Sequence, residues 1–161
     1  MTILQPDSDS GIVADREPPT GSAVEMHELT RLDCLRLLAT TSVGRVGVSV
    51  KDWDHPVIRP VNYVFDESSQ SVLIRSGQGS KLHALLRSTN AVFEIDGTDP
   101  VGRAGWSVII AGVTVEITDP AELRRIEGLG LEPWAPGHKG HWIAIRATTV
   151  SGRRISVTSA Q

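Results

Sequence analysis

The order of hydrophobic and polar positions predicts a chain built mainly of β-strands with a few short helices. Residues 29–40 place leucines on one face at helical spacing, and Thr30 followed by Asp33 is typical of a helix N-cap. After this helix the pattern changes to that of strands. We expect strands over residues 43–50, 57–65, 72–76, 91–95, 105–118, 141–150 and 155–157, and further short helices over residues 80–87 and 119–127.

This order of elements indicates the fold class. Because the strands do not alternate regularly with helices, a doubly wound parallel sheet is not expected. An antiparallel barrel with helices on its outside fits better. The N-terminal segment is rich in Pro, Asp, Ser and Gly and poor in large apolar residues, a composition that does not bury enough surface to fold. We therefore expect a disordered tail over residues 1–24 and one domain over residues 25–161.

Charge and cysteine content narrow the functional classes. The net charge is −3 and no run of Lys or Arg occurs, so a nucleic-acid partner is not expected. No apolar stretch reaches the roughly 20 residues of a membrane span. The N-terminus lacks the layout of a secretory signal, and the single cysteine, Cys34, cannot form an internal disulfide. We interpret Cys34 as a packed thiol and expect the protein in the cytoplasm.

The strongest local signal is the run from Ser76 to Leu82, Ser-Gly-Gln-Gly-Ser-Lys-Leu. Here a predicted strand ends, two glycines follow, and a helix is expected to begin at Ser80. A helix N-terminus offers unpaired N–H groups and partial positive charge, which suit a phosphate. Ser80 would add a hydroxyl donor and Lys81 a full charge. The alternative is an ordinary strand–loop–helix turn in which Ser80 only caps the helix.

A second signal is the run Arg59-Pro60-Val61-Asn62-Tyr63. Pro60 has no N–H to donate to a sheet, so it predicts an edge or a break in strand pairing, where backbone groups are free to bond a ligand. On a pleated strand, Arg59, Val61 and Tyr63 point to one side, and Pro60 and Asn62 to the other. Arg59 either extends to water or pairs with an anion.

Other residues give weaker signals. Trp106 begins the long apolar strand and is interpreted as core or interface packing. His138 and His141 lie three positions apart without a nearby Cys or carboxylate, so no metal site is expected. His83 is placed at a helix surface. No Ser-His-Asp grouping and no dinucleotide-binding glycine fingerprint occurs, and no residue is identified as catalytic.

Taken in order, several segments resemble the pyridoxamine 5′-phosphate oxidase-like family of FMN-binding proteins, and especially a branch of small actinobacterial members. The resemblance covers about residues 29–155. The segments that carry it are residues 43–46, 59–63, 79–82, 105–108 and 133–137. It implies a homodimeric, antiparallel split β-barrel of six strands with two flavins at the subunit interface.

The resemblance also implies a set of cofactor-binding residues. Residues 59–62 would lie along the isoalloxazine ring, Arg75 and Ser76 beside the ribityl chain, and Ser80 and Lys81 at the 5′-phosphate. The stretch from Trp106 to Ser107 would come from the other subunit and close the ring pocket. The full set is Arg59, Pro60, Val61, Asn62, Arg75, Ser76, Ser80, Lys81, Leu82, Trp106 and Ser107.

The function implied is that of an FMN-dependent oxidoreductase that transfers hydride or electrons between flavin and an unidentified small molecule. Arg59 and Tyr63 are candidates for flavin tuning or substrate contact. The chain is shorter than the vitamin B6 oxidase and lacks its longer basic phosphate cluster, so oxidation of pyridoxamine phosphate is not expected.

Four alternatives remain open. The protein could bind flavin only to store or sense it, or it could be a purely structural dimer. It could bind the deazaflavin F420, whose charged tail needs a basic groove. The cations available for that groove are Arg45, Arg59, Arg75 and Lys81. It could also bind haem through His83, His138 or His141.

Overall fold

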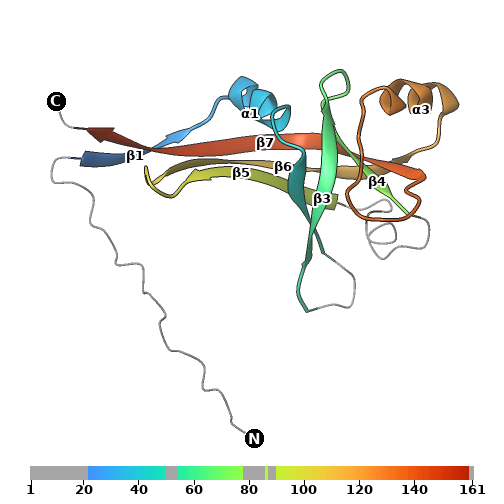
Figure 1. Ribbon diagram of the computed structural model, residues 1–161, viewed down its shortest axis with the longest axis horizontal. Coiled ribbons are helices and arrows are strands. Elements are labelled where there is room, and N and C mark those ends of the chain that lie inside the picture. Colours follow the sequence, from blue (N-terminus) through green and yellow to red (C-terminus); the bar gives the residue numbers. More distant parts are fainter. Residues whose placement is uncertain (1–21, 50–53, 78–85, 87–89, 160–161) are drawn as a thin grey trace, which may run out of the picture.

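The computed structural model describes residues 22–49, 54–77, 86 and 90–159, which form one antiparallel sheet closed into a barrel. The strand order is β1-β7-β4-β3-β2-β5-β6, and a further pairing between β6 and β7 closes six of these strands into a ring (Figure 1). The predicted mainly-β split barrel is therefore confirmed. No helix among the described residues is long and apolar enough to cross a membrane.

The helices and strands follow the predicted order, with two differences in the strands. The strands are β1 Ser22–Glu28, β2 Val43–Val48, β3 Val57–Asp66, β4 Ser71–Ser76, β5 Asn90–Asp99, β6 Ala104–Ile117 and β7 His141–Ser159, and the helices are α1 Arg31–Leu38 and α3 Pro120–Glu127. Strand β1 was not predicted, and β7 is continuous where two strands were expected. The helix expected over residues 80–87 lies almost wholly outside the described residues.

Both differences have one cause, which is pairing between distant segments. Strand β7 pairs with β4 through His141–Arg146, with β6 from Trp142 to Ile155, and with β1 through Arg153–Ser159. The polar run around Gly152 remains a strand because β6 pairs with β7 as far as Ile155. The domain boundary expected near Glu25 falls inside β1, and residues 1–21 lie outside the described part.

The main core fills the barrel and the space beneath α1. Thr30 caps α1 by accepting a hydrogen bond from the Asp33 backbone N–H, as predicted. Cys34 and Leu38 are fully buried against the barrel, and burial raises the pKa of the Cys34 thiol. The interpretation of Cys34 as a packed thiol is confirmed.

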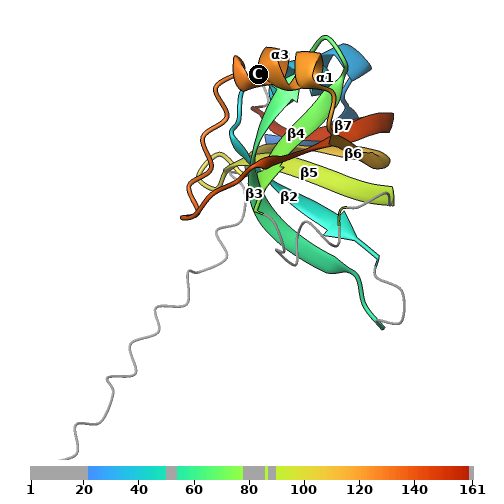
Figure 2. The same cartoon turned by 90° about the vertical axis from the view of Figure 1, so that its right-hand side faces the viewer.

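A second apolar cluster lies on the outer side of the sheet, under α3 and the loop of residues 128–140. It consists of Leu73, Ile117, Ile126, Leu131, Trp142 and Ala144. Both helices lie on the same side of the barrel (Figure 2). Arg125 of α3 forms an ion pair of 2.7 Å with Asp66, which ties the helix to the end of β3. Leu131 of the loop packs in this cluster, which holds the loop against the sheet.

Candidate functional site

A cavity of about 390 Å³ lies where β3 separates from β4. The ladder between these strands covers only residues 63–66 of β3. The preceding residues, Pro60, Val61 and Asn62, pair with β2 on one side and line the cavity. The prediction that Pro60 marks a break in strand pairing is confirmed on the β4 side.

Five of the predicted cofactor-binding residues meet in this cavity. Pro60, Val61 and Asn62 come from β3, and Arg75 and Ser76 come from the end of β4. The remaining walls are Val43 of β2 and four residues of the loop that leads into β7, namely Pro133, Trp134, Ala135 and Lys139. No carboxylate or histidine lines this cavity among the described residues.

Arg75 is held in place as a cation beside the cavity. Its Nε donates a hydrogen bond of 2.9 Å to the backbone carbonyl of Lys139, and its guanidinium lies 5.2 Å from the centre of the Trp142 ring. Within the described part of the chain, no carboxylate pairs with it. Its remaining N–H groups are therefore available to an anion, for which a guanidinium is a strong donor.

Lys139 is a second cation, which the sequence analysis did not identify. Its Nζ lies 3.9 Å from the position that a Cβ on Gly77 would occupy, at the start of the predicted phosphate segment. Lys139 stands in a Gly- and Pro-rich loop with no periodic pattern. It comes close to Gly77 only because β7 pairs with β4, with His141 opposite Ser76. Nothing local in the sequence signals this approach.

The loop over the cavity is attached to β3 through Asn62. The backbone N–H of Trp134 donates a hydrogen bond of 2.8 Å to Asn62 Oδ1. Both residues also line a neighbouring cavity of about 320 Å³ between the end of α1 and the loop. Sequence analysis noted residues 133–137 only as part of a family resemblance and assigned Trp134 no role.

Two predicted residues have their side chains elsewhere in the structure. Arg59 is exposed, and its guanidinium donates to the carbonyl of the preceding residue, Ile58, over 2.8 Å. Trp106 is partly buried and packs against the main core, with its ring over Gly97. Neither residue lines the cavity between β3 and β4.

Ser107 lies on the opposite face of β6 from Trp106. Through the ladders of β5 and β2, this is the same outer face as that of Asn62. In its own chain Ser107 lines a separate hollow of about 420 Å³. Ser80, Lys81 and Leu82 lie outside the described residues.

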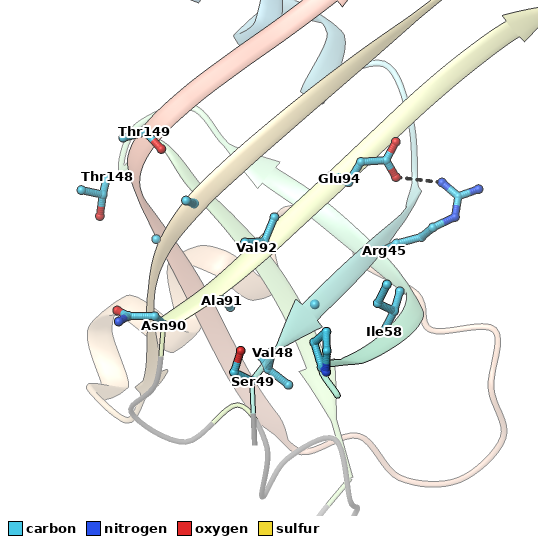
Figure 3. Close-up of a pocket in the computed structure, with 14 residues that line it drawn as sticks. Arg45, Val48, Ser49, Ile58, Asn90, Ala91, Val92, Glu94, Thr148 and Thr149 are labelled. Atoms are coloured by element: carbon cyan, nitrogen blue, oxygen red, sulfur yellow. Dashed lines mark hydrogen bonds and ion pairs between the residues drawn. The ribbon is translucent and has the colours of Figure 1, made fainter. Parts of the chain in front are cut away.

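A larger, mostly apolar cavity of about 730 Å³ lies farther along the same outer face (Figure 3). Gly47 and Ile58 of the β2–β3 pair line it together with Val92 of β5. Along β2, Val43 lines the first cavity whereas Arg45 and Gly47 line the second, so the two are adjacent. We refer to these two adjacent cavities together as the groove; Arg75 and Lys139 line the first, and mostly apolar residues line the second.

Arg45 does not add free charge to this groove, contrary to what the sequence suggested. Its guanidinium donates to Glu94 over 2.9 Å (Figure 3). It also donates to Asp96. These hydrogen bonds raise the pKa of Arg45, chiefly through Asp96. Because two carboxylates already balance it, Arg45 is a poor partner for the charged tail of a ligand.

The other candidate titratable groups have partners elsewhere in the structure. Tyr63 is buried; its hydroxyl donates to the carbonyl of Leu38 over 2.8 Å and lies 2.6 Å from Thr41 Oγ1. Burial raises the pKa of Tyr63 to about 12, so it is poorly suited to proton transfer near neutral pH. His141 Nδ1 lies 2.6 Å from a carboxylate oxygen of Glu116.

Metal ligation has no support in the described part of the chain. No group of three or more His, Cys, Asp or Glu residues gathers there in a metal-binding arrangement. Of the three histidines considered for haem, His138 lies in the loop of residues 128–140, and His83 lies outside the described residues.

Comparisons with known proteins show the family of the chain. A family model described as pyridoxamine 5′-phosphate oxidase matches residues 30–154. An uncharacterized protein of Mycobacterium tuberculosis is 34% identical over 143 residues, which cover 86% of this chain and 91% of that protein.

Two solved structures share the fold and are at least 30% identical in sequence to this chain. A FAD binding protein from Mycobacterium smegmatis is 30% identical with a TM-score of 0.68, covering 80% of this chain and 98% of the other. A conserved protein of unknown function from Corynebacterium diphtheriae is 35% identical with a TM-score of 0.66, covering 80% and 96%. The chain belongs to the pyridoxamine 5′-phosphate oxidase-like family of flavin-binding split-barrel proteins.

Proposed function

We propose that this protein binds FMN in the groove formed by the two adjacent cavities and acts as a homodimeric, flavin-dependent oxidoreductase. The observation that carries the proposal is the cavity between β3 and β4. It gathers five residues expected to contact the cofactor, together with two cations, Arg75 and Lys139, that no carboxylate of the described residues balances.

The shape and charge of the groove suit an amphipathic anion. The phosphate of FMN would face Arg75 and Lys139, near Gly77. The ring would lie along Pro60 to Asn62, toward the apolar cavity. With Arg45 already paired to two carboxylates, few cations remain for the longer anionic tail of a deazaflavin. This favours FMN, and the similarity to a FAD binding protein supports a flavin in general.

The bound flavin would supply the hydride and electron transfer, which belong to the cofactor. The chain's own residues would hold the phosphate through charge-assisted hydrogen bonds and place the ring against the backbone of β3. The apolar walls would exclude water. Because the cavity between β3 and β4 has no carboxylate or histidine among its described walls, the site suits a reaction that depends on stacking more than on proton transfer. The small-molecule substrate is not identified by these features.

The same outer face supports the proposed homodimer. Ile58, Val92, Ile109 and Val113 point outward from neighbouring strands and are 60%, 45%, 42% and 44% exposed. A second copy covering this face would remove them from water, which is favourable. Since Ser107 lies on this face but lines no part of its own chain's β3–β4 cavity, it would contribute only across the interface.

Alanine replacements of the two cations test the proposal. We expect Arg75→Ala and Lys139→Ala each to weaken FMN binding about tenfold, the effect of losing one charge-assisted hydrogen bond. Arg124→Ala removes an exposed arginine of α3 and is the control for net charge. Equal FMN affinity in all variants would refute the site. Turnover of FMN with a reduced nicotinamide donor then separates an enzyme from a storage or sensing protein.

A further inference from the structure

Trp134 is exceptional among the aromatic side chains of the described residues. Tyr63, Phe93 and Trp142 are nearly or fully buried, whereas Trp134 is 75% exposed. Its indole stands at the edge of the β3–β4 cavity, and it fills no described core cluster. A large aromatic surface left in water beside a cavity is typical of a binding surface.

The position of Trp134 is fixed by a residue of the cavity itself. Its backbone N–H donates to Asn62 Oδ1 over 2.8 Å, and Asn62 lies on the stretch of β3 that is not paired with β4. Gly130 and Gly137, on either side in the loop, have φ angles of 72° and 93°. These left-handed conformations, which favour glycine, let the loop turn toward β3.

We propose that Trp134 is a flavin-binding residue whose indole stacks on the isoalloxazine ring, and that Asn62 is the positioning residue that holds it there. The inference rests on the proposed flavin function. A ring lying against the backbone of residues 60–62 would have the sheet on one side and the anchored indole on the other. The described walls of the cavity offer no other aromatic ring for stacking.

Flavin fluorescence gives a direct readout, because an indole stacked on isoalloxazine quenches its emission. The probes are FMN and riboflavin, which carry the same ring with and without the phosphate. We expect the wild-type protein to quench both on binding. In Trp134→Ala the fluorescence of the bound flavins should be several-fold brighter. The affinity for both flavins should fall about tenfold, the typical effect of losing one stacked aromatic side chain. Trp134→Phe should restore most of the affinity.

The role of Asn62 is tested by its dependence on Trp134. Asn62→Ala alone should weaken riboflavin binding. In the Trp134→Ala background it should have little further effect, because Asn62 would act by positioning the indole that this variant lacks. Lys139→Ala should weaken the binding of FMN but not that of riboflavin. This difference separates binding of the ring from binding of the phosphate.

Three results would overturn the inference. The first is unchanged quenching and affinity in Trp134→Ala. The second is loss of quenching in Trp106→Phe instead, which would assign the stacking to Trp106. The third is a Trp134→Ala variant that changes only the dimer equilibrium. Each of these leaves the proposed flavin site intact, whereas failure of the wild-type protein to bind either flavin would refute the proposed function itself.

Discussion

At the scale of single residues, the function of a side chain depends on which partners the fold gives it. Arg45, Arg75 and Arg59 are all arginines of the barrel strands with similar sequence surroundings. Arg45 is balanced by two carboxylates, Arg59 donates to a neighbouring carbonyl, and Arg75 keeps free donors beside a cavity. Of the three, only Arg75 is both unbalanced by a carboxylate and part of the wall of the β3–β4 cavity, which suits an anionic ligand.

Tyr63 is expected to act through structure rather than chemistry. Its hydroxyl joins β3 to the end of α1 through the carbonyl of Leu38 and the hydroxyl of Thr41. Tyr63→Phe would leave these two groups without that partner and lower the free energy of unfolding by about 1–2 kcal/mol. Urea denaturation measures the change. A loss of flavin affinity at unchanged stability would show instead that the hydroxyl serves the site.

Gly112 and Gly47 offer a matched pair of glycine-to-alanine substitutions. A Cβ on Gly112 would lie 2.1 Å from the backbone oxygen of Arg146, at the irregularity where the β6–β7 register shifts. On Gly47 the nearest atom would be 3.8 Å away. Gly112→Ala should therefore destabilise the fold by about 3 kcal/mol or more, and Gly47→Ala by much less. Similar unfolding midpoints for both variants would contradict this local geometry.

At the scale of elements, sequence patterns predicted what is local and missed what depends on distant pairing. The Thr30 cap of α1 and the Asp119 cap of α3 are local, and both helices lie where expected. Strand β1 has no strong pattern of its own, since Val24 and Met26 are exposed, and only its ladder with β7 makes it a strand.

The candidate site likewise contains features that the sequence predicts and features that depend on distant packing. The break at Pro60 could be predicted, because the absence of an N–H is a property of that residue alone. The positions of Lys139 and Trp134 could not be predicted, because the path of an irregular loop over the sheet depends on the packing beneath it. Leu131 and Trp142, in the second apolar cluster, supply that packing.

The attachment of α3 to β3 predicts a dependence of stability on pH. Hydrogen bonds from Arg125, followed by those from Ser69 and Ser68, hold the pKa of the buried Asp66 carboxyl well below its usual range. Because the pKa of Asp66 is lower in the folded state, its ionised carboxylate stabilises the fold fully at pH values above the unfolded pKa of about 4. This stabilisation is lost as the pH falls from there through the folded-state pKa.

Arg125→Ala should thus lower the free energy of unfolding at neutral pH, by an amount that the partial exposure of the guanidinium keeps modest. The difference from the wild type should shrink as the pH falls from 5 toward 2. The neighbouring Arg124→Ala is the control and should have little effect. A difference that stays constant over this pH range would show that the ion pair does not carry the effect.

At the scale of the whole molecule, the account requires that two copies complete each flavin site. Ile58→Glu places a charge on the exposed apolar face and should shift the protein toward monomers in sedimentation experiments, with release of flavin. Val101→Glu, at a position 96% exposed beyond β5, is the matched control and should remain dimeric. Full flavin retention in a proven monomer would contradict a site shared between subunits.

The most direct test of the central claim is the absorption and fluorescence spectrum of the purified protein during titration with FMN, with FAD, deazaflavin F420 and haem as comparisons. We expect FMN to bind with about one site per chain and to show perturbed flavin absorption bands. Binding of haem or of the deazaflavin in preference to FMN would contradict the assigned cofactor, and binding of none would contradict the assignment of Arg75, Lys139 and Asn62 to a cofactor site.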